Sequence, residues 1–294
     1  MPRDTEDRAN GRPRTVAADG GSRTETVGGG TQKVTTDGTT LRYADAGDPD
    51  RPTVAFLPDA GFGPWSWGWQ APALAGPYRT LVSATRGTGG SDASAPYGVD
   101  RLAADLDAIL ADAGVDRVHL VGAGLGGMVA LRYAREYGRA RSLVLVGAAP
   151  SGDDVDDEAL ARLHPSADDR SALRGSLSLA FSERFLTDAA VGRDVAESIV
   201  EWRHDEDARG DALAGHLDAV LRFDAGPLHQ LQLPTLVCHG VDDPVVPVGA
   251  GQTLADALPR GRFEPVEGKR LCYVEHSAAV TDAIDGFVDG VRSR

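Results

Sequence analysis

The stretch from residue 118 to residue 131 constrains the fold more than any other part of the chain. It begins with the apolar run Val118–Val121, continues through a turn with four glycines, and ends in the first turns of an apolar helix. Glycine allows a positive φ and a close approach of neighbouring backbone. A buried strand that passes through a tight turn directly into a helix is typical of the parallel sheets of α/β proteins.

Gly124 stands at the tip of this turn. In the pattern Gly-x-Ser-x-Gly this position carries a serine nucleophile on a strained strand-to-helix turn. Glycine has no side chain with which to attack a carbonyl, so the sequence predicts the backbone of a nucleophile elbow without its nucleophile. Two interpretations are open. Glycine adopts the strained turn at the least cost, or the missing side chain makes room for a ligand group against the Leu125 amide at the helix N-terminus.

The rest of the pattern predicts alternating strands and helices. A hairpin turns at Asp37-Gly38. Strands are expected over residues 40–44, 53–57, 80–83, 118–121, 142–146, 234–238 and 262–266, with helices over 99–113, from the glycine turn to 137, between the last two strands and up to 291. Short apolar strands that alternate with amphipathic helices predict an α/β fold with a mostly parallel sheet covered by helices on both faces.

The chain divides into three parts. Residues 1–30 contain almost no large apolar side chain, so a disordered polar tail is expected there. The α/β core is predicted over residues 31–149 and 229–294. Between residues 150 and 228 the apolar strand signal disappears and the pattern indicates acidic helices. Because this segment follows the sixth strand, we expect a helical lid over the edge at which open α/β sheets bind ligands.

Charge and composition restrict the partners. The net charge is −14, from 33 Asp, 11 Glu, 28 Arg and only 2 Lys. Clustered positive charge is not evident, so neither nucleic acid nor a membrane surface is expected as a partner. A carboxylate-rich, lysine-poor surface is typical of halophilic proteins, and the lack of an apolar leader or span favours the cytoplasm. The two cysteines lack metal-ligand spacing, and no metal or cofactor is expected.

Taken together, these segments resemble the α/β-hydrolase fold, and within it the lidded 3-oxoadipate enol-lactonases and related carboxylesterases. The resemblance covers roughly residues 31–292. It rests on five ordered motifs, which are Phe56-Leu57-Pro58-Asp59-Ala60-Gly61 with the following Trp67, Arg86-Gly87-Thr88-Gly89-Gly90-Ser91, the glycine turn, Gly240-Val241-Asp242-Asp243-Pro244-Val245-Val246-Pro247, and Leu271-Cys272-Tyr273-Val274-Glu275-His276.

The resemblance implies a catalytic triad of which one member remains. Asp243 stands where the family has its triad carboxylate. Gly124 replaces the nucleophile, and Arg270 stands where the family has its histidine. A triad needs the acid to orient the histidine and the histidine to take the proton. Arg270 cannot act as that base, because a guanidinium stays protonated at physiological pH.

The oxyanion hole implied by the resemblance consists of the amides of Ala60 and Leu125. Asp59 replaces a glycine of the family beside this hole, and a carboxylate there raises the barrier to forming an oxyanion. Asp59, Trp67 and Lys269 are the candidates for the pocket wall.

Two functional hypotheses follow. In the first, the chain is a pseudoenzyme with a degenerate triad that binds a small molecule or a protein partner, and Asp243 and Arg270 form a structural salt bridge. In the second, it is a non-triad enzyme, either a weak ester or lactone hydrolase or a lyase or isomerase that uses Asp243 as base and Arg270 to bind a substrate carboxylate. Serine-type hydrolysis is expected to be absent under both.

Overall fold

The computed structural model describes residues 30–188 and 192–293, and within them eight strands form a single sheet. The strand order is β1-β2-β4-β3-β5-β6-β7-β8. β1 and β2 run antiparallel to their neighbours, whereas the six strands from β4 to β8 pair in parallel. The strands are β1 Gly30–Thr36, β2 Thr39–Ala46, β3 Thr53–Leu57, β4 Arg79–Ala84, β5 Val118–Ala123, β6 Ala140–Val146, β7 Thr235–Gly240 and β8 Gly261–Val266.

Helices connect the parallel strands and cover the sheet. The core helices are η1 Pro64–Trp67, α1 Gln70–Leu74, α2 Val99–Asp112, α3 Leu125–Glu136, α9 Val248–Ala257, α10 Cys272–Glu275 and α11 Ser277–Arg292. Between β6 and β7 lie η2 Gly152–Asp154, α4 Asp157–Leu163, α5 Arg170–Ala180, α6 Glu183–Thr187, α7 Gly192–Glu206, α8 Gly210–Leu221 and η3 Leu228–Gln230. None of the helices described is both long and apolar enough to cross a membrane.

Burial along the strands shows where the core lies. Every residue of β3 and β5 is buried, which requires cover on both faces of the sheet, whereas β1 at the edge is mostly exposed. Helix α1 packs against α11, and α2 packs against α3. The predicted α/β architecture is therefore confirmed.

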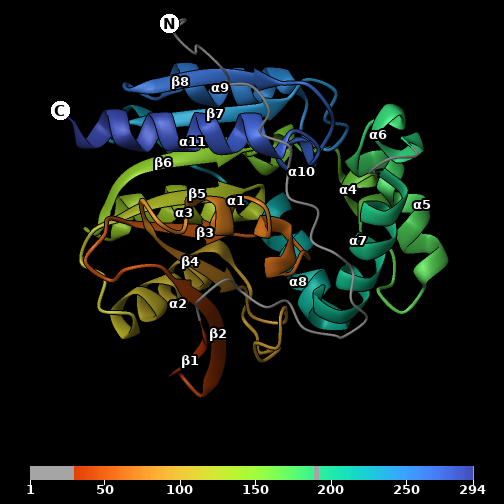
Figure 1. Ribbon diagram of the computed structural model, residues 1–294, viewed down its shortest axis with the longest axis horizontal. Coiled ribbons are helices and arrows are strands. Elements are labelled where there is room, and N and C mark those ends of the chain that lie inside the picture. The colour runs from red at the N-terminus through yellow and green to blue at the C-terminus, as the bar shows by residue number, and fades with distance from the viewer. Residues whose placement is uncertain (1–29, 189–191, 294) are drawn as a thin grey trace, which may run out of the picture.

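The predicted boundaries agree with the observed ones to within a few residues for the core strands and helices. Gly114, at φ 65°, follows α2 as the expected stop. The tail predicted over residues 1–30 lies outside the described residues except for Gly30, which begins β1. The segment 150–228 is helical, and Figure 1 shows α4 to α7 beside the edge of the sheet at which the parallel strands end.

The parallel strands give the sheet two different edges. At the carboxyl edge, β3, β5 and β7 lead into the segments that begin at Pro58, Gly124 and Val241. At the amino edge, β3 and β6 are entered from the segments around Arg51 and Arg139. Residues distant in the sequence therefore meet at each edge, and both edges carry clusters of charged side chains.

Candidate functional site

The backbone of the elbow is retained at Gly124. This residue lies between β5 and α3 with φ 44° and ψ −111°, a combination that favours glycine. A Cβ atom on Gly122 would overlap the Gly126 carbonyl, and one on Gly126 would overlap the Leu57 carbonyl. The close approach of β5, α3 and the end of β3 thus depends on glycines, as the sequence pattern predicts.

Asp59 places its carboxylate at the two amides expected to form the oxyanion hole. Its Oδ1 accepts hydrogen bonds from the Ala60 N–H at 2.7 Å and the Leu125 N–H at 2.8 Å. The second amide belongs to the first residue of α3, where the helix dipole favours a negative charge. An oxygen of the protein itself therefore lies where a substrate oxyanion would bind.

Arg270 joins Asp59 to Asp243. Its Nε and Nη2 lie 2.8 and 2.7 Å from Asp59 Oδ2, and its Nη1 lies 3.0 Å from Asp243 Oδ2. Nη1 also donates to the Gly147 carbonyl at 2.6 Å. The segments after β3, β6, β7 and β8 are thereby connected by one guanidinium.

This cluster of Asp59, Asp243 and Arg270 is closed to solvent. The three residues are only 2%, 6% and 4% exposed. Burial by itself lowers the pKa of Arg270, but the two carboxylates outweigh that effect and raise it above its usual range. The guanidinium is therefore fixed in its charged form and cannot accept a proton.

The space beside Gly124 is filled by this cluster. A Cβ atom added at Gly124 would overlap both Asp59 Oδ1 and Arg270 Nη2. A serine could not enter this position unless Asp59 and Arg270 moved. The glycine at the elbow and the carboxylate at the two amides therefore depend on each other.

Asp243 has both carboxylate oxygens engaged. Oδ1 accepts from the amides of Val245 and Val246 at 2.8 and 3.2 Å, while Oδ2 faces Arg270. His239 lies nearby, with Nε2 3.7 Å from Asp243 Oδ2, but this nitrogen donates to the Val246 carbonyl at 2.8 Å. Burial lowers the pKa of His239, so it is a neutral neighbour of the cluster.

The other two candidates for the pocket wall lie apart from the cluster. Trp67 is fully buried, with its ring centroid 4.6 Å from that of Tyr273 and 5.2 Å from that of Phe56. It also lines a cavity of about 290 Å³ between β2, β4 and η1. Lys269 Nζ donates to the Ser178 carbonyl at 2.7 Å, which connects it to α5. The structure therefore does not bring Asp59, Trp67 and Lys269 into one open pocket.

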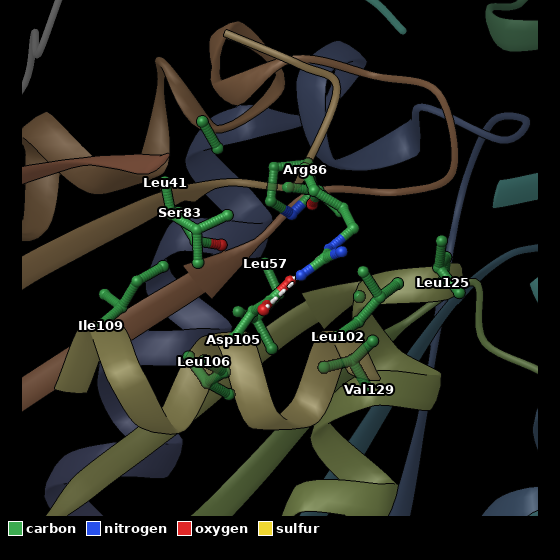
Figure 2. Close-up of a pocket in the computed structure, with 14 residues that line it drawn as sticks. Leu41, Leu57, Ser83, Arg86, Leu102, Asp105, Leu106, Ile109, Leu125 and Val129 are labelled. Atoms are coloured by element: carbon green, nitrogen blue, oxygen red, sulfur yellow. Dashed lines mark hydrogen bonds and ion pairs between the residues drawn. The ribbon is translucent and has the colours of Figure 1, made fainter. Parts of the chain in front are cut away.

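A small cavity lies behind the elbow, between α2 and the strand ends. Figure 2 shows Ser83, Leu125 and Val129 in its wall, beside the ion pair between Arg86 and Asp105. Arg86 Nε and Nη2 donate to the Asp105 carboxylate at 2.6 and 2.7 Å. The volume of about 30 Å³ is enough for a water molecule and too small for an ester or lactone. The conspicuous Arg86 of the second motif thus has a structural partner.

Two buried histidines at this edge were not found by the sequence reasoning. His216 of α8 accepts from the Gly61 amide at 3.1 Å through Nδ1, and its Nε2 donates to the Arg86 carbonyl at 3.0 Å. His164, just after α4, packs on Phe62 with ring centroids 4.7 Å apart. Burial lowers the pKa of both histidines, that of His216 to about 4. No sequence motif surrounds either residue, so only the fold could reveal them.

Thiol and metal chemistry find no support at this edge. Burial raises the pKa of Cys272 far above its usual range, so its thiol is not a ready nucleophile. Among the residues that the structure describes, no group of three His, Cys, Asp or Glu side chains is placed to hold a metal ion.

The chain is similar in sequence to a lactonase and to a putative carbamate hydrolase. The chain is 26% identical over 254 residues to 3-oxoadipate enol-lactonase 2 of Acinetobacter baylyi, covering 84% of this chain and 92% of that protein. It is 29% identical over 245 residues to a putative carbamate hydrolase, RutD, of Stutzerimonas stutzeri, covering 80% and 89%.

Solved structures and a family model agree with this similarity. A hydrolase from Pseudomonas aeruginosa superimposes with a TM-score of 0.76 at 27% identity, covering 88% of this chain and 98% of that one. The enol-lactonase from Burkholderia xenovorans gives a TM-score of 0.77 at 20% identity, covering 88% and 100%. The model of the alpha/beta hydrolase fold matches residues 57–277, most of the chain. This chain therefore belongs to the α/β-hydrolase fold family.

Proposed function

We propose that this chain is a non-hydrolytic member of its family, a pseudoenzyme that acts by binding rather than by cleaving a substrate. The observation that carries the proposal is the position of Asp59 Oδ1, within 2.8 Å of both the Ala60 and the Leu125 amides. An oxyanion hole stabilises charge that develops in the transition state. A hole already occupied by a full negative charge of the protein cannot perform that task.

The nucleophile and base positions support the same proposal. Gly124 has no hydroxyl, and the charged Arg270 cannot take a proton from one. Loss of nucleophile or base typically costs about 10⁶ in turnover. Three coordinated replacements that pack against each other favour a structural use of the former triad over an altered hydrolytic mechanism.

The alternative, a non-triad enzyme with Asp243 as base, requires rearrangement. Both Asp243 oxygens accept hydrogen bonds inside the protein, and the side chain is almost fully buried. A substrate carboxylate would have to displace Asp59 from Arg270 before Asp243 could be exposed. The helical segment 150–228, proposed as a lid, would have to open for such a substrate.

The test is an ester and lactone hydrolysis panel measured at high KCl, since the charge of −14 calls for screening. The native chain is compared with Asp243→Ala, with the triple variant Asp59→Gly, Gly124→Ser, Arg270→His, and with the matched double variant that keeps Gly124. We expect activity only in the triple variant. The double variant shows whether the new serine is responsible.

Native turnover that disappears in Asp243→Ala would overturn the proposal and establish the non-triad enzyme. Native turnover that survives in Asp243→Ala would also contradict a pseudoenzyme, and would point to another site. Folding of each variant is checked by circular dichroism and thermal unfolding, because Asp59 and Arg270 are buried.

A further inference from the structure

A second charged site lies at the opposite edge of the sheet, where the parallel strands begin. A cavity of about 770 Å³ opens there beside the last turn of α11. Its wall contains five arginines and one histidine, which are Arg51, Arg79, Arg117, Arg141, Arg292 and His119. We call this the amino-edge cavity.

Positive charge predominates in this cavity although the chain as a whole is strongly acidic. Asp50 and Asp116 are the two carboxylates in its wall, against five guanidinium groups. Asp116 lies 3.5 Å from Arg139, an arginine outside the wall, and its side chain is exposed. The local excess of positive charge contrasts with the net charge of −14. Such a concave surface of one sign concentrates field lines and attracts anions.

The five guanidinium groups of the cavity differ in how strongly they are already paired within the protein. Arg79 is held by Asp45 at 2.6 Å. Two further ion pairs, between Arg51 and Asp48 and between Arg292 and Asp289, are long, at 3.9 and 3.8 Å, and exposed. Such ion pairs are weak. In residues 30–188 and 192–293, no ion pair involves Arg117 or Arg141.

His119 provides an independent indication of a binding site. Its side chain lines the cavity although the residue is only 6% exposed. Nδ1 lies 2.8 Å from Ser142 Oγ, and the structure gives Nε2 no hydrogen-bond partner among the described residues. Burial, together with the positive charges of Arg292 and Arg141, lowers the pKa of this histidine to about 4. A neutral imidazole therefore lies among guanidinium groups.

The fold creates this site from scattered residues. Arg51 precedes β3, Arg117 precedes β5, Arg141 is the second residue of β6 and Arg292 ends α11. These arginines lie far apart along the chain, and only the fold brings them to one cavity. Parallel strands bring their amino ends to one edge, and the antiparallel α11 brings its carboxyl end there too, as Figure 1 shows near the C-terminus.

We propose that the amino-edge cavity binds a small molecule that carries a phosphate or diphosphate group. Guanidinium groups bind phosphate oxygens through paired, charge-assisted hydrogen bonds, and several arginines around one hollow suit an anion with several oxygens. The cavity volume exceeds the need of a phosphate alone, so the ligand has room for an organic part. This site is separate from the cluster at Asp59 and does not depend on whether the chain hydrolyses esters.

The test measures binding of inorganic pyrophosphate to the full chain by calorimetry, at constant ionic strength set with KCl. Native protein is compared with the double variant Arg117→Gln, Arg141→Gln. The control is Arg162→Gln, Arg184→Gln, which removes the same charge from exposed arginines of the helical segment 150–228. We expect saturable one-to-one binding that weakens at least tenfold in the first double variant and changes less than twofold in the control.

Three results would overturn the proposal. Pyrophosphate could fail to bind the native chain at millimolar concentration, it could bind both double variants equally, or succinate at the same ionic strength could bind as tightly. If pyrophosphate does not bind, the cavity is not an anion site. If both double variants bind it equally, the site lies elsewhere. If succinate binds as tightly, the cavity binds dianions in general and does not select phosphate. His119→Asn offers a second variant within the cavity, expected to weaken binding, and thermal unfolding at pH 8 checks that it folds.

Discussion

The two edges of the sheet use arginine in opposite ways. At the carboxyl edge, Arg270 is buried and its charge is neutralised by Asp59 and Asp243. At the amino edge, Arg117 and Arg141 are exposed around a cavity and have no carboxylate partner in the described chain. A charge that is paired inside the protein cannot be removed without leaving its buried partner uncompensated, whereas an unpaired charge at the surface is available to a ligand. The carboxyl edge therefore holds its guanidinium in a closed cluster, whereas the amino edge carries the ligand site that we propose.

Removing Arg270 should produce the largest effect, because it leaves two buried carboxylates without a counter-charge. Arg270→Met is expected to lower the free energy of unfolding by about 3–5 kcal/mol. Denaturant unfolding at pH 7.5 and fixed KCl measures the change. If Arg270→Met were as stable as the native chain, the cluster would not hold this edge together, and the contrast between the edges would fail.

Acidification should lower the free energy of unfolding through His119 at the amino edge. A buried neutral histidine with its pKa lowered to about 4 stabilises the fold fully above pH 6.5, and this contribution is lost as the pH falls from 6.5 towards 4. For His119 the loss is about 3 kcal/mol. The measurement is the free energy of unfolding from pH 7.5 to 4 for the native chain and for His119→Asn.

His216 and His164 add a similar slope in both proteins, so the difference between the two curves reports His119 alone. We expect the native chain to lose more stability than the variant over this range. Parallel curves would mean that His119 is not held neutral in the amino-edge cavity.

Gly124→Ala tests whether the elbow and Asp59 depend on each other. The added Cβ overlaps Asp59 and Arg270, and the backbone conformation itself disfavours alanine, so a loss of about 2–3 kcal/mol is expected. In an Asp59→Gly background the overlap with Asp59 is removed, and the same change should cost at least about 1 kcal/mol less. A double-mutant cycle by denaturant unfolding gives this coupling. Additive effects would show that the glycine is needed for its conformation alone.

The smallest effect is expected at the amino edge. Arg117→Gln, Arg141→Gln should change the free energy of unfolding by no more than about 0.5 kcal/mol, because exposed and unpaired side chains contribute little to stability. In the same unfolding measurement, saturating pyrophosphate should stabilise the native chain more than this variant. A large destabilisation without ligand would give these arginines a structural role instead.

Much of the architecture is determined by local sequence. Apolar runs such as residues 53–57 and 118–121 specify buried strands, and the glycines at 122, 124 and 126 specify a turn in which backbone atoms almost touch. These features depend on neighbouring residues and on the steric properties of glycine, so they can be derived from the sequence alone. The absence of a serine at Gly124 and of a base at Arg270 is visible in the same way.

Only the tertiary structure determines which charged side chains lie close together. The family resemblance implies an oxyanion hole beside Asp59, but only the fold puts Asp59 Oδ1 on both amides and its Oδ2 on Arg270, 211 residues away. In the same way, five arginines that look dispersed along the chain surround one cavity because parallel strands begin at a common edge. Electrostatic interactions act through space and depend on burial, and neither distance nor burial between remote residues is written in local sequence.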